Sequence, residues 1–506
     1  VQGKKALVLN NDNAVSSLLN VIFTDNEVAI ENKNGDVKLN TVKVDAENGT
    51  QLNKVINESL MTIVSSIINS LTDNSGTLSI SGTSIFANID NKQAGVVNTA
   101  DKVTITHIDN AGEVNAYGIL IVTEFNNNGT LSTNGNTTIQ TLNNEGTATL
   151  NGLSDIIITL VNNQNVVSHS RGLDIGTLTN KISGDVKLSG TNDKVSLLDN
   201  KGNVSTTNVT AITTLNNYNN VVLGGTSNSE VPADTVDSLE NTTGATLTSN
   251  SSNALFKYVN NAGNIHLSGA NDTIYVLENT NTIDASVKTT FGENASSSLV
   301  NSGTITSEGS TTIVGALTGT GLFTLNENLR LTGSIAEEQR LTISNNAILT
   351  IETGTLNLNG NDVWAGNVTL TSGTLNYLDL TSNGVLFAET GDLNINSGTL
   401  NIINTAYIKK EVLVSIKEGS FLNISGGEVT FNNNDDWKGE VDLVSGTLNY
   451  TELTANGVLK ATAGTLNVLS GTLTIDENSF INGDVLTTIE TDSTVKLTGG
   501  NVELNR

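Results

Sequence analysis

The chain has 506 residues, with no cysteine, one proline, 47 glycines and a formal net charge of −27. This charge excludes a nucleic-acid backbone as the default partner, because phosphate recognition needs clustered Lys and Arg side chains. The sequence contains no apolar run of the length (about 18 residues) that a membrane-spanning helix requires. Apolar residues make up 37% and aromatic residues 4%, which predicts a thin core of Leu, Ile and Val.

The pattern of residues 1–72 predicts an N-terminal β/α capping region, made of short strands and one helix. Short runs such as residues 27–30 and 36–39 alternate between apolar and polar side chains, which is typical of β-strands. Over residues 52–71 apolar side chains recur every three or four positions and predict one amphipathic helix. Repeat proteins need capped ends, so we expect this helix to cover the end or one side of the stack. A partner-binding or membrane-surface helix is the alternative, although Lys and Arg are too few for a membrane surface. The apolar positions are Leu52, Val55, Ile56, Leu60, Ile63, Val64, Ile67, Ile68 and Leu71.

From residue 73 onward one short phrase recurs along the chain. It reads Asn-x-Gly-x-apolar-x-apolar, and its glycines stand at positions 76, 95, 112, 129 and 146. A nearly constant spacing combined with strand-type alternation is the signature of a solenoid. We therefore predict an all-β fold, a long right-handed parallel β-helix, over residues 73–340 and beyond.

The phrase also predicts how successive coils fit together. Alternate apolar residues point inward, and glycine accommodates φ values at the corners that a Cβ atom would forbid. Asparagine is expected to stack on the asparagine one coil above and to form a hydrogen-bonded ladder. Pro232 lies in the longest step between turn glycines, so we expect a loop to leave the stack near 227–234. A second loop is expected near 285–298.

The repeat becomes longer from residue 341. Trp364 returns as Trp437 and Tyr377 as Tyr450, each at an offset of 73 (437 − 364 and 450 − 377). This spacing predicts copies at 341–413 and 414–486 and a truncated third copy at 487–506. We expect the parent chain to continue beyond Arg506, because a finished solenoid ends on a cap. The chain starts without Met or a basic leader, so we also expect a processed N-terminus.

The Asn-x-Gly-Thr-Leu phrase, as in Asn127-Asn128-Gly129-Thr130-Leu131, and the Ser-Gly-Thr-Leu-Asn phrase, as in residues 372–376, resemble those of bacterial autotransporter adhesin passengers. The absence of cysteine and the acidic charge agree with that resemblance, which covers about residues 73–506. It implies a secreted or cell-surface β-helix, exported through the outer membrane, that serves in cell adhesion. Surface-layer and fibre-forming proteins have a similar composition and remain an alternative.

Candidate catalytic residues are few. The histidines, His107, His169 and His266, are expected on widely separated coils, so no Ser-His-Asp arrangement is supported. Asp435 and Asp436 form the closest acidic pair of the kind that polysaccharide-cleaving enzymes use. The pair precedes Trp437 in a turn, which favours a solvated corner, and we predict no catalytic residues.

Calcium is the one cofactor whose binding the sequence suggests. Asp193 and Asp272 end similar Gly-x-x-Asp turns that resemble calcium-binding turns. Calcium needs six to eight oxygen ligands, and here the acidic turns do not stack in adjacent coils. The pattern favours turn capping, with calcium at Asp193 or Asp272 as the alternative.

The repeated aromatic residues Trp364, Trp437, Tyr377 and Tyr450 have two interpretations. They could form a sugar-binding surface, or each Trp could cover a bend where the shape of the coil changes. The second interpretation is favoured.

Together these patterns favour a non-enzymatic rod at the bacterial cell surface or in the extracellular space. Its expected partner is a ligand on a host or neighbouring cell. The first alternative is a self-assembling subunit of a surface layer or filament, whose partner is a second copy of the chain. The second is a β-helix enzyme that degrades polysaccharides.

Overall fold

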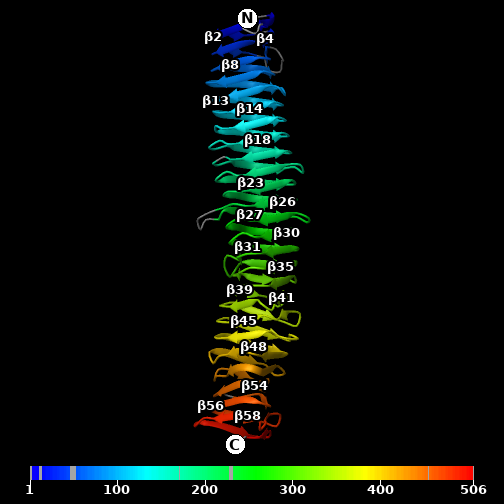
Figure 1. The fold of residues 1–506 in the computed structure, drawn as a ribbon, viewed down its shortest axis with the longest axis vertical. Helices are drawn as coiled ribbons and strands as arrows, with labels where there is room; N and C mark the ends of the chain where they lie inside the picture. The colour runs from blue at the N-terminus through cyan, green and yellow to red at the C-terminus, as the bar shows by residue number, and fades with distance from the viewer. Residues whose placement is uncertain are drawn as a thin grey trace. The chain divides into compact units, whose positions relative to one another are not determined.

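The computed structural model describes residues 3–10, 14–24, 26–45, 53–169, 171–226, 232–453 and 455–504. These residues form a parallel β-solenoid of about 25 turns and contain no helix, and therefore none that could cross a membrane. The chain divides into two compact units, Val1–Leu255 and Phe256–Arg506. Within each unit the strands follow one another along the stack in chain order (Figure 1). The predicted all-β parallel solenoid is thus confirmed.

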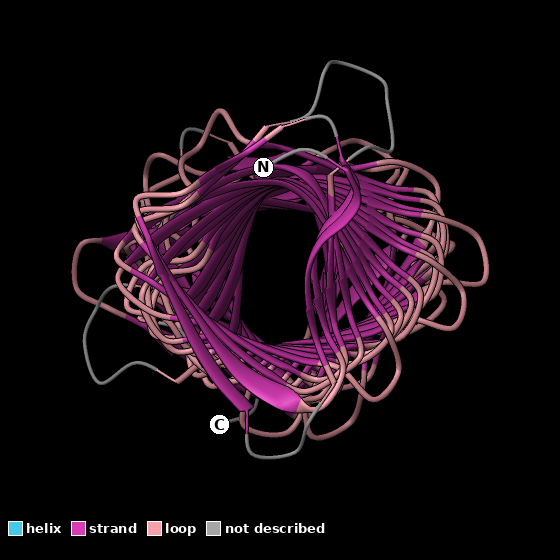
Figure 2. Ribbon diagram, turned by 90° about the horizontal axis from the view of Figure 1, so that it is seen from above, coloured by secondary structure: helices cyan, strands magenta, loops and turns pink. Residues whose placement is uncertain are grey.

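One coil of the N-terminal unit shows how the sequence forms a turn of the solenoid. β13 (Lys102–Asn110) pairs in parallel with β15 (Ile119–Asn127), one coil further on, and β14 (Glu113–Ala116) pairs with β16 (Thr130–Thr133). The pairing of β13 omits Thr106, where the alternation of buried and exposed residues changes phase. The long strand therefore turns a corner and serves two faces of the coil. Seen along the stack, strands lie over strands and the turns lie at the periphery (Figure 2).

The repeated turn glycines are required by close stacking. A Cβ atom on Gly112 would lie 2.2 Å from the carbonyl oxygen of Gly95, and one on Gly129 would lie 2.1 Å from that of Gly112. Neither Gly112 nor Gly129 has a positive φ. The expectation that these corner glycines relieve φ is therefore wrong for this column. The glycine is needed because the backbone of the preceding coil occupies the position of a side chain.

An asparagine ladder runs through the core of the N-terminal unit, as the sequence predicts. Each side-chain Nδ2 donates to the Oδ1 of the ladder residue in the next coil, over 2.7 to 3.0 Å. The side chains of the twelve ladder asparagines are at most 1% exposed. The same amides also donate to carbonyls of the turns, as in Asn74 Nδ2 to Gly76 O at 3.0 Å. The ladder comprises Asn32, Asn57, Asn74, Asn91, Asn110, Asn127, Asn144, Asn162, Asn180, Asn200, Asn217 and Asn241.

The ladder supplies hydrogen-bond partners to backbone groups in the turns of the narrow coil. A turn between two strands leaves backbone carbonyls that the sheet does not satisfy, and an unpaired buried polar group destabilises a fold. An asparagine amide can donate twice and accept twice, so one side chain joins its own turn to both neighbouring coils. The C-terminal unit begins with the same arrangement, in which Asn261, Asn279 and Asn301 are linked over 2.8 Å each.

The predicted N-terminal helix is wrong. Residues 53–71 of that segment lie in or beside three strands, β7 (Lys54–Asn57), β8 (Leu60–Val64) and β9 (Ile67–Asn74), and Leu52 lies outside the described residues. These strands pair in parallel with the coils before and after them. The region expected to be a cap is therefore already part of the solenoid.

The burial pattern explains the error. Leu60 and Ile67 belong to the predicted apolar helix face, yet they are 42% and 38% exposed. Asn57 and Ser70 are buried instead. Each strand alternates with period two, but the intervening turns shift the phase, and the joined pattern imitates a helical period. The β-branched residues of the segment favour strands, and this preference prevails because the neighbouring coils offer edges to pair with.

The two predicted loops have different outcomes. Residues 227–231 of the first lie outside the described residues, and β27 (Asp234–Asn241) begins at its last position. In the second, Thr289–Phe291 form β33 and pair with β31 (Asp272–Asn279) and β36 (Thr311–Ile313). Only residues 292–297 lie between β33 and β34 (Ser298–Asn301). Most of that segment thus stays close to the stack.

The ladder yields a stability prediction. We expect Asn127→Ala to destabilise its coil by about 2–4 kcal/mol, because Asn110 loses its acceptor and Asn144 its donor inside the core. The measurement is native-state hydrogen exchange of the amides in the neighbouring strands, since a solenoid can open locally.

Asn126→Ala is the matched control. Asn126 faces outward and links Asp109 to Asn143 at 2.9 and 2.8 Å at the surface. We expect a loss below about 1 kcal/mol there. Equal losses for Asn126→Ala and Asn127→Ala would contradict a special role for the buried ladder.

Candidate functional site

The predicted histidines do not form one site. His107 on β13 lies 3.1 Å from Asp109 and 3.3 Å from Glu124, measured between ring nitrogen and carboxylate oxygen. His266 on β30 (Asn264–Leu267) contacts Asp284 at 3.0 Å. His169 follows β20 (Asn165–Ser168) in yet another coil. These contacts of His107 and His266 join carboxylates of the same or the adjacent strand at the surface and include no nucleophile.

The calcium candidates Asp193 and Asp272 are fully buried. The carboxylate of Asp193 accepts hydrogen bonds from Gly190 N at 3.0 Å, Leu173 N at 3.2 Å and Ser168 Oγ at 3.3 Å. Gly269 N donates to Asp272 at 3.2 Å in the same manner. This is the turn capping that the sequence favours. Among the described residues, no group of three or more His, Cys, Asp or Glu side chains could hold a metal ion.

Two further buried carboxylates, Asp155 and Asp234, have the same capping role. Asp155 accepts from Gly152 N and Thr137 N at 3.0 Å each, and Asp234 accepts from Gly225 N at 2.8 Å. Burial raises the pKa values of Asp155, Asp193 and Asp234. The Gly-x-x-Asp spacing of Gly152 and Asp155 is the signal that could have identified Asp155, whereas Asp234 is separated from Gly225 by an insertion.

The repeated aromatic residues are core residues, so they cannot form the sugar-binding surface considered above. Trp364 and Trp437 are 2% exposed, and each Nε1 donates over 3.0 Å to a carbonyl two positions ahead. Tyr377 and Tyr450 are fully buried and donate to the carbonyls of residues 399 and 472 at 2.7 and 2.8 Å. Burial raises the pKa of both tyrosines to about 12.

The acidic pair also differs from expectation. Asp436 is exposed beside Lys438 at 2.5 Å, but Asp435 is buried, so the predicted solvated corner is wrong for Asp435. Its carboxylate accepts from Val414 N and Asn432 N at 2.7 Å each. Burial raises the pKa of Asp435 to about 6. Asp362, its counterpart in the preceding copy, has the same arrangement with residues 341 and 359 and a raised pKa.

The strands themselves recur at the same offset as the sequence. β44 (Val363–Trp364), β47 (Val385–Ala388) and β50 (Tyr407–Ile408) correspond to β53 (Asp436–Trp437), β55 (Val458–Ala461) and β57 (Phe480–Ile481). The buried side chains are repeated with them. Many exposed positions are not, as in Ala365 and its counterpart Lys438, and one of the places where they differ is a corner of the coil at residues 407–413 and 428–434.

We call this place the Lys410 corner and define it as residues 407–413 and 428–434. Comparison with the preceding copy shows how far it has changed. At the positions 73 residues earlier, which we call the preceding copy and whose residues 334–340 lie before the repeat boundary at 341, four different residues stand in place of Tyr407, Lys409, Lys410 and Asn433, namely Ser334, Ala336, Glu337 and Gly360. The change replaces small and acidic side chains with an aromatic ring, two amines and an amide. The same strand scaffold thus carries different polar side chains at this corner.

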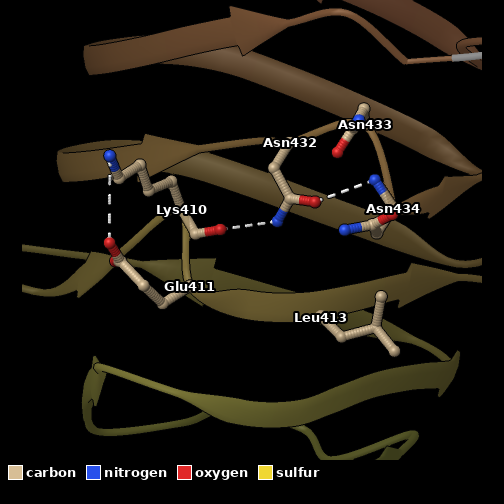
Figure 3. A pocket seen from close by; sticks show the side chains of 6 residues that line it. All are labelled: Lys410, Glu411, Leu413, Asn432, Asn433 and Asn434. Atoms are coloured by element: carbon tan, nitrogen blue, oxygen red, sulfur yellow. Dashed lines mark hydrogen bonds and ion pairs between the residues drawn. The ribbon is translucent and has the colours of Figure 1, made fainter.

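Two adjoining pockets lie in the Lys410 corner. The first, of about 290 Å³, is lined by Lys410, Glu411, Leu413, Asn432, Asn433 and Asn434. In Figure 3 the charged pair lies on one side and the amides of residues 433 and 434 on the other. The second pocket, of about 320 Å³, shares Lys410 and Glu411 and is otherwise lined by Tyr407, Ile408, Lys409, Glu428 and Thr430.

The aromatic side of the corner is fixed by contacts between neighbouring coils. The rings of Phe387 and Tyr407 lie 5.3 Å apart at an angle of 57°. The hydroxyl of Tyr407 donates to Glu389 at 2.8 Å, and Lys409 Nζ lies 3.2 Å from Glu389 and 5.2 Å from the centre of the tyrosine ring. These hydrogen bonds lower the pKa of Glu389 and raise that of Tyr407. The half-buried ring is therefore held in one orientation.

The amide side is fixed by Asn432. Its Nδ2 donates to Lys410 O at 2.6 Å, and its Oδ1 accepts from Asn434 N at 2.8 Å (Figure 3). Its own N–H is held by the buried carboxylate of Asp435. The exposed side chains of Asn433 and Asn434 have no hydrogen-bond partner among the residues that the structure describes. The side-chain amides of Asn433 and Asn434 thus face solvent, while Asn432 and Asp435 hold the backbone of this turn in place.

The preceding copy has a pocket at the equivalent corner with different chemistry. Its volume is about 480 Å³, and its lining includes the carboxylates of Glu337, Glu338 and Asp379 and no basic residue. The backbone turn is the same, since Asn361 N donates to Asn359 Oδ1 at 2.8 Å. The repeat thus supplies an internal comparison in which the scaffold is kept and the lining is changed.

No family model matches this chain, and neither a curated protein nor a solved structure matches it. The Lys410 corner was missed by sequence analysis. A position-by-position comparison of the repeated copies could have found it, because Tyr407, Lys409 and Lys410 depart from the preceding copy within four positions.

Asp435 yields a pH prediction. Its pKa is higher in the folded protein than in the unfolded chain, so the folded state binds the proton more tightly. Its contribution to stability is therefore present at low pH and is lost as pH rises through about 6. Relative to Asp435→Asn, the wild type should gain on the order of 1 kcal/mol between pH 7 and pH 5. Urea unfolding followed by circular dichroism at both pH values measures this difference.

Asp436→Asn is the control for this experiment, because the exposed neighbour carries the same charge. It should leave the pH dependence of the wild type nearly unchanged. If Asp435→Asn shows the same slope as the wild type, Asp435 is ionised in the core at pH 5 and its proposed protonation is refuted.

Proposed function

We propose that this chain is a non-enzymatic scaffold of the bacterial cell surface or extracellular space, whose solenoid presents an adhesive site at the Lys410 corner. The observation that carries the proposal is the contrast within the long repeat. Buried residues such as Trp364 and Trp437 keep their identity and contacts, while Lys410 replaces Glu337 at the exposed corner.

The physical argument starts from rigidity. The coils beside the Lys410 corner are tied together by parallel pairing of β47 with β50 and of β50 with β52 (Phe421–Thr430), so a corner residue has little freedom to move. A site on such a scaffold loses little conformational entropy when a ligand binds. Because binding groups on adjacent strands are spaced by the sheet, their separation is set by the fold rather than by a flexible loop.

The resemblance to autotransporter adhesin passengers supports the same proposal. It rests on the repeated Asn-x-Gly-Thr-Leu and Ser-Gly-Thr-Leu phrases and on the acidic composition. The partner in this proposal is a ligand on the surface of a host or neighbouring cell. Self-association into a layer or filament is the competing outcome, in which the corner would contact another copy.

An adhesion assay tests the proposal. Beads coated with the protein should bind to bacterial or animal cells more than beads coated with albumin. A variant that carries the preceding copy's residues, Tyr407→Ser, Lys409→Ala, Lys410→Glu and Asn433→Gly, should lose most of this binding. It should stay folded, because the exchanged side chains are exposed or half-buried and the preceding copy accommodates their replacements.

Matched changes in the preceding copy, Glu337→Ala and Asn361→Ala, are the control and should leave adhesion unchanged. Absence of adhesion by the wild type, with sheets or filaments seen by electron microscopy, would replace the adhesive role with self-assembly. Release of reducing ends from polysaccharides by the purified protein would refute the non-enzymatic part of the proposal.

A further inference from the structure

We infer that the Lys410 corner binds a neutral saccharide chain, with one sugar ring against Tyr407 and the next between Lys410 and the amides of Asn433 and Asn434. This inference deepens the proposed function and rests on it for its biological meaning. The argument uses the charge of the lining, the aromatic surface, the free amides and the volume of the two pockets.

The charge of the corner favours a neutral ligand. The protein carries a formal net charge of −27, yet the lining contains equal numbers of amines, of Lys409 and Lys410, and carboxylates, of Glu411 and Glu428. Lys410 Nζ lies 4.0 Å from Glu411, so neither charge is left alone. An anionic ligand would meet the carboxylates and a cationic one the amines. A neutral ligand with hydroxyl groups can instead donate to the carboxylates and accept from the amines.

The aromatic surface favours a ring with apolar faces. Tyr407 is half-buried, Phe387 packs against it at 5.3 Å and Lys409 Nζ lies 5.2 Å from its centre, so a sugar ring would contact the part of the tyrosine that these neighbours leave exposed. Its hydroxyl is already bound to Glu389 and holds the ring upright. Aromatic rings offer apolar contact at a low entropic cost. The C–H face of a pyranose is the complement of such a surface, and its edge carries the hydroxyls that the polar lining can bind.

The amides favour the same ligand. The side chains of Asn433 and Asn434 each have one acceptor and two donor hydrogens, and neither makes a hydrogen bond to another described residue. Adjacent hydroxyls of a sugar need a donor and an acceptor close together, which an amide supplies. Leu413, which is 43% exposed, adds an apolar contact in the same pocket.

The two pockets suit a chain of at least two rings. Their volumes of about 290 and 320 Å³ adjoin at Lys410 and Glu411. Each is at the lower end of the range of small-molecule sites, roughly 300–1,000 Å³. Both are open to solvent along the coil surface, so a chain could enter from the side and extend beyond the corner.

The test uses an array of neutral oligosaccharides of hexoses and N-acetylhexosamines, together with sulfated and sialylated counterparts. The wild-type protein should bind at least one neutral oligosaccharide. Raising the salt concentration from about 50 to about 500 mM should change the affinity less than about twofold, because screening weakens mainly interactions between charges. Tyr407→Ser and Asn434→Ala should each weaken binding about tenfold.

Asn361→Ala is the matched control, because Asn361 occupies the position of Asn434 in the preceding copy. It should leave binding unchanged. Lys410→Glu provides a second variant that keeps both aromatic rings, in case Tyr407→Ser disturbs the coil. Circular dichroism checks that each variant is folded.

The outcomes separate this inference from the proposed function. Binding only to acidic saccharides, no saccharide binding, or binding that survives both Tyr407→Ser and Lys410→Glu would overturn the inference. Cell adhesion that persists in the presence of excess soluble saccharide would also overturn it, while the adhesive role would stand. Saccharide binding at the corner without adhesion to any cell would support the inference and refute the adhesive role.

Discussion

Hydrogen bonding between successive coils is the interaction on which the rest of this structure depends. A single coil has too few inward side chains to form a core, and its strands have no partners of their own. Stacking supplies both at once, because the parallel ladders satisfy the backbone while apolar residues such as Val103, Ile105 and Ile108 meet their counterparts above and below. The asparagine ladder extends the same principle to the turns, where backbone pairing alone is insufficient.

Much of the fold could be predicted from the sequence, because stacking requires particular residue types at fixed positions of the repeat. Gly112 and Asn110 recur since the neighbouring coil leaves no room for a Cβ atom at one position and needs an amide at the other. The segment around Leu60 and Ile67 was misassigned for a physical reason. Local periodicity cannot distinguish a helix face from three short strands whose turns shift the phase, and only pairing with neighbouring coils decides between them.

The candidate site was less accessible to sequence reasoning. Trp437 and Tyr450 are candidates for a binding surface because aromatic residues are rare in this chain. Their recurrence in the long repeat, however, also marks them as core residues. The Lys410 corner has the opposite character, since Lys409 and Lys410 have no basic counterpart 73 residues earlier or later. The contacts of Tyr407 and Lys409 with Glu389 depend on the register between strands of adjacent coils, and the repeat period alone does not specify this register. In a repetitive protein, departures from the repeat at exposed positions are more informative about function than the repeat itself.

The asparagine ladder has a direction. From Asn32 to Asn217 every side-chain Nδ2 donates toward the later coil, and from Asn57 to Asn241 every Oδ1 accepts from the earlier one. The amide dipoles are therefore aligned head to tail, as peptide dipoles are in a helix, and each bond polarises the next. Reversing one amide would place two donors or two acceptors face to face, so no ladder residue can turn over alone. An aspartate at such a position could accept but not donate, and the polarity of the column would end there. The N-terminal unit thus has a buried electrostatic axis that runs with the sequence, built from uncharged side chains.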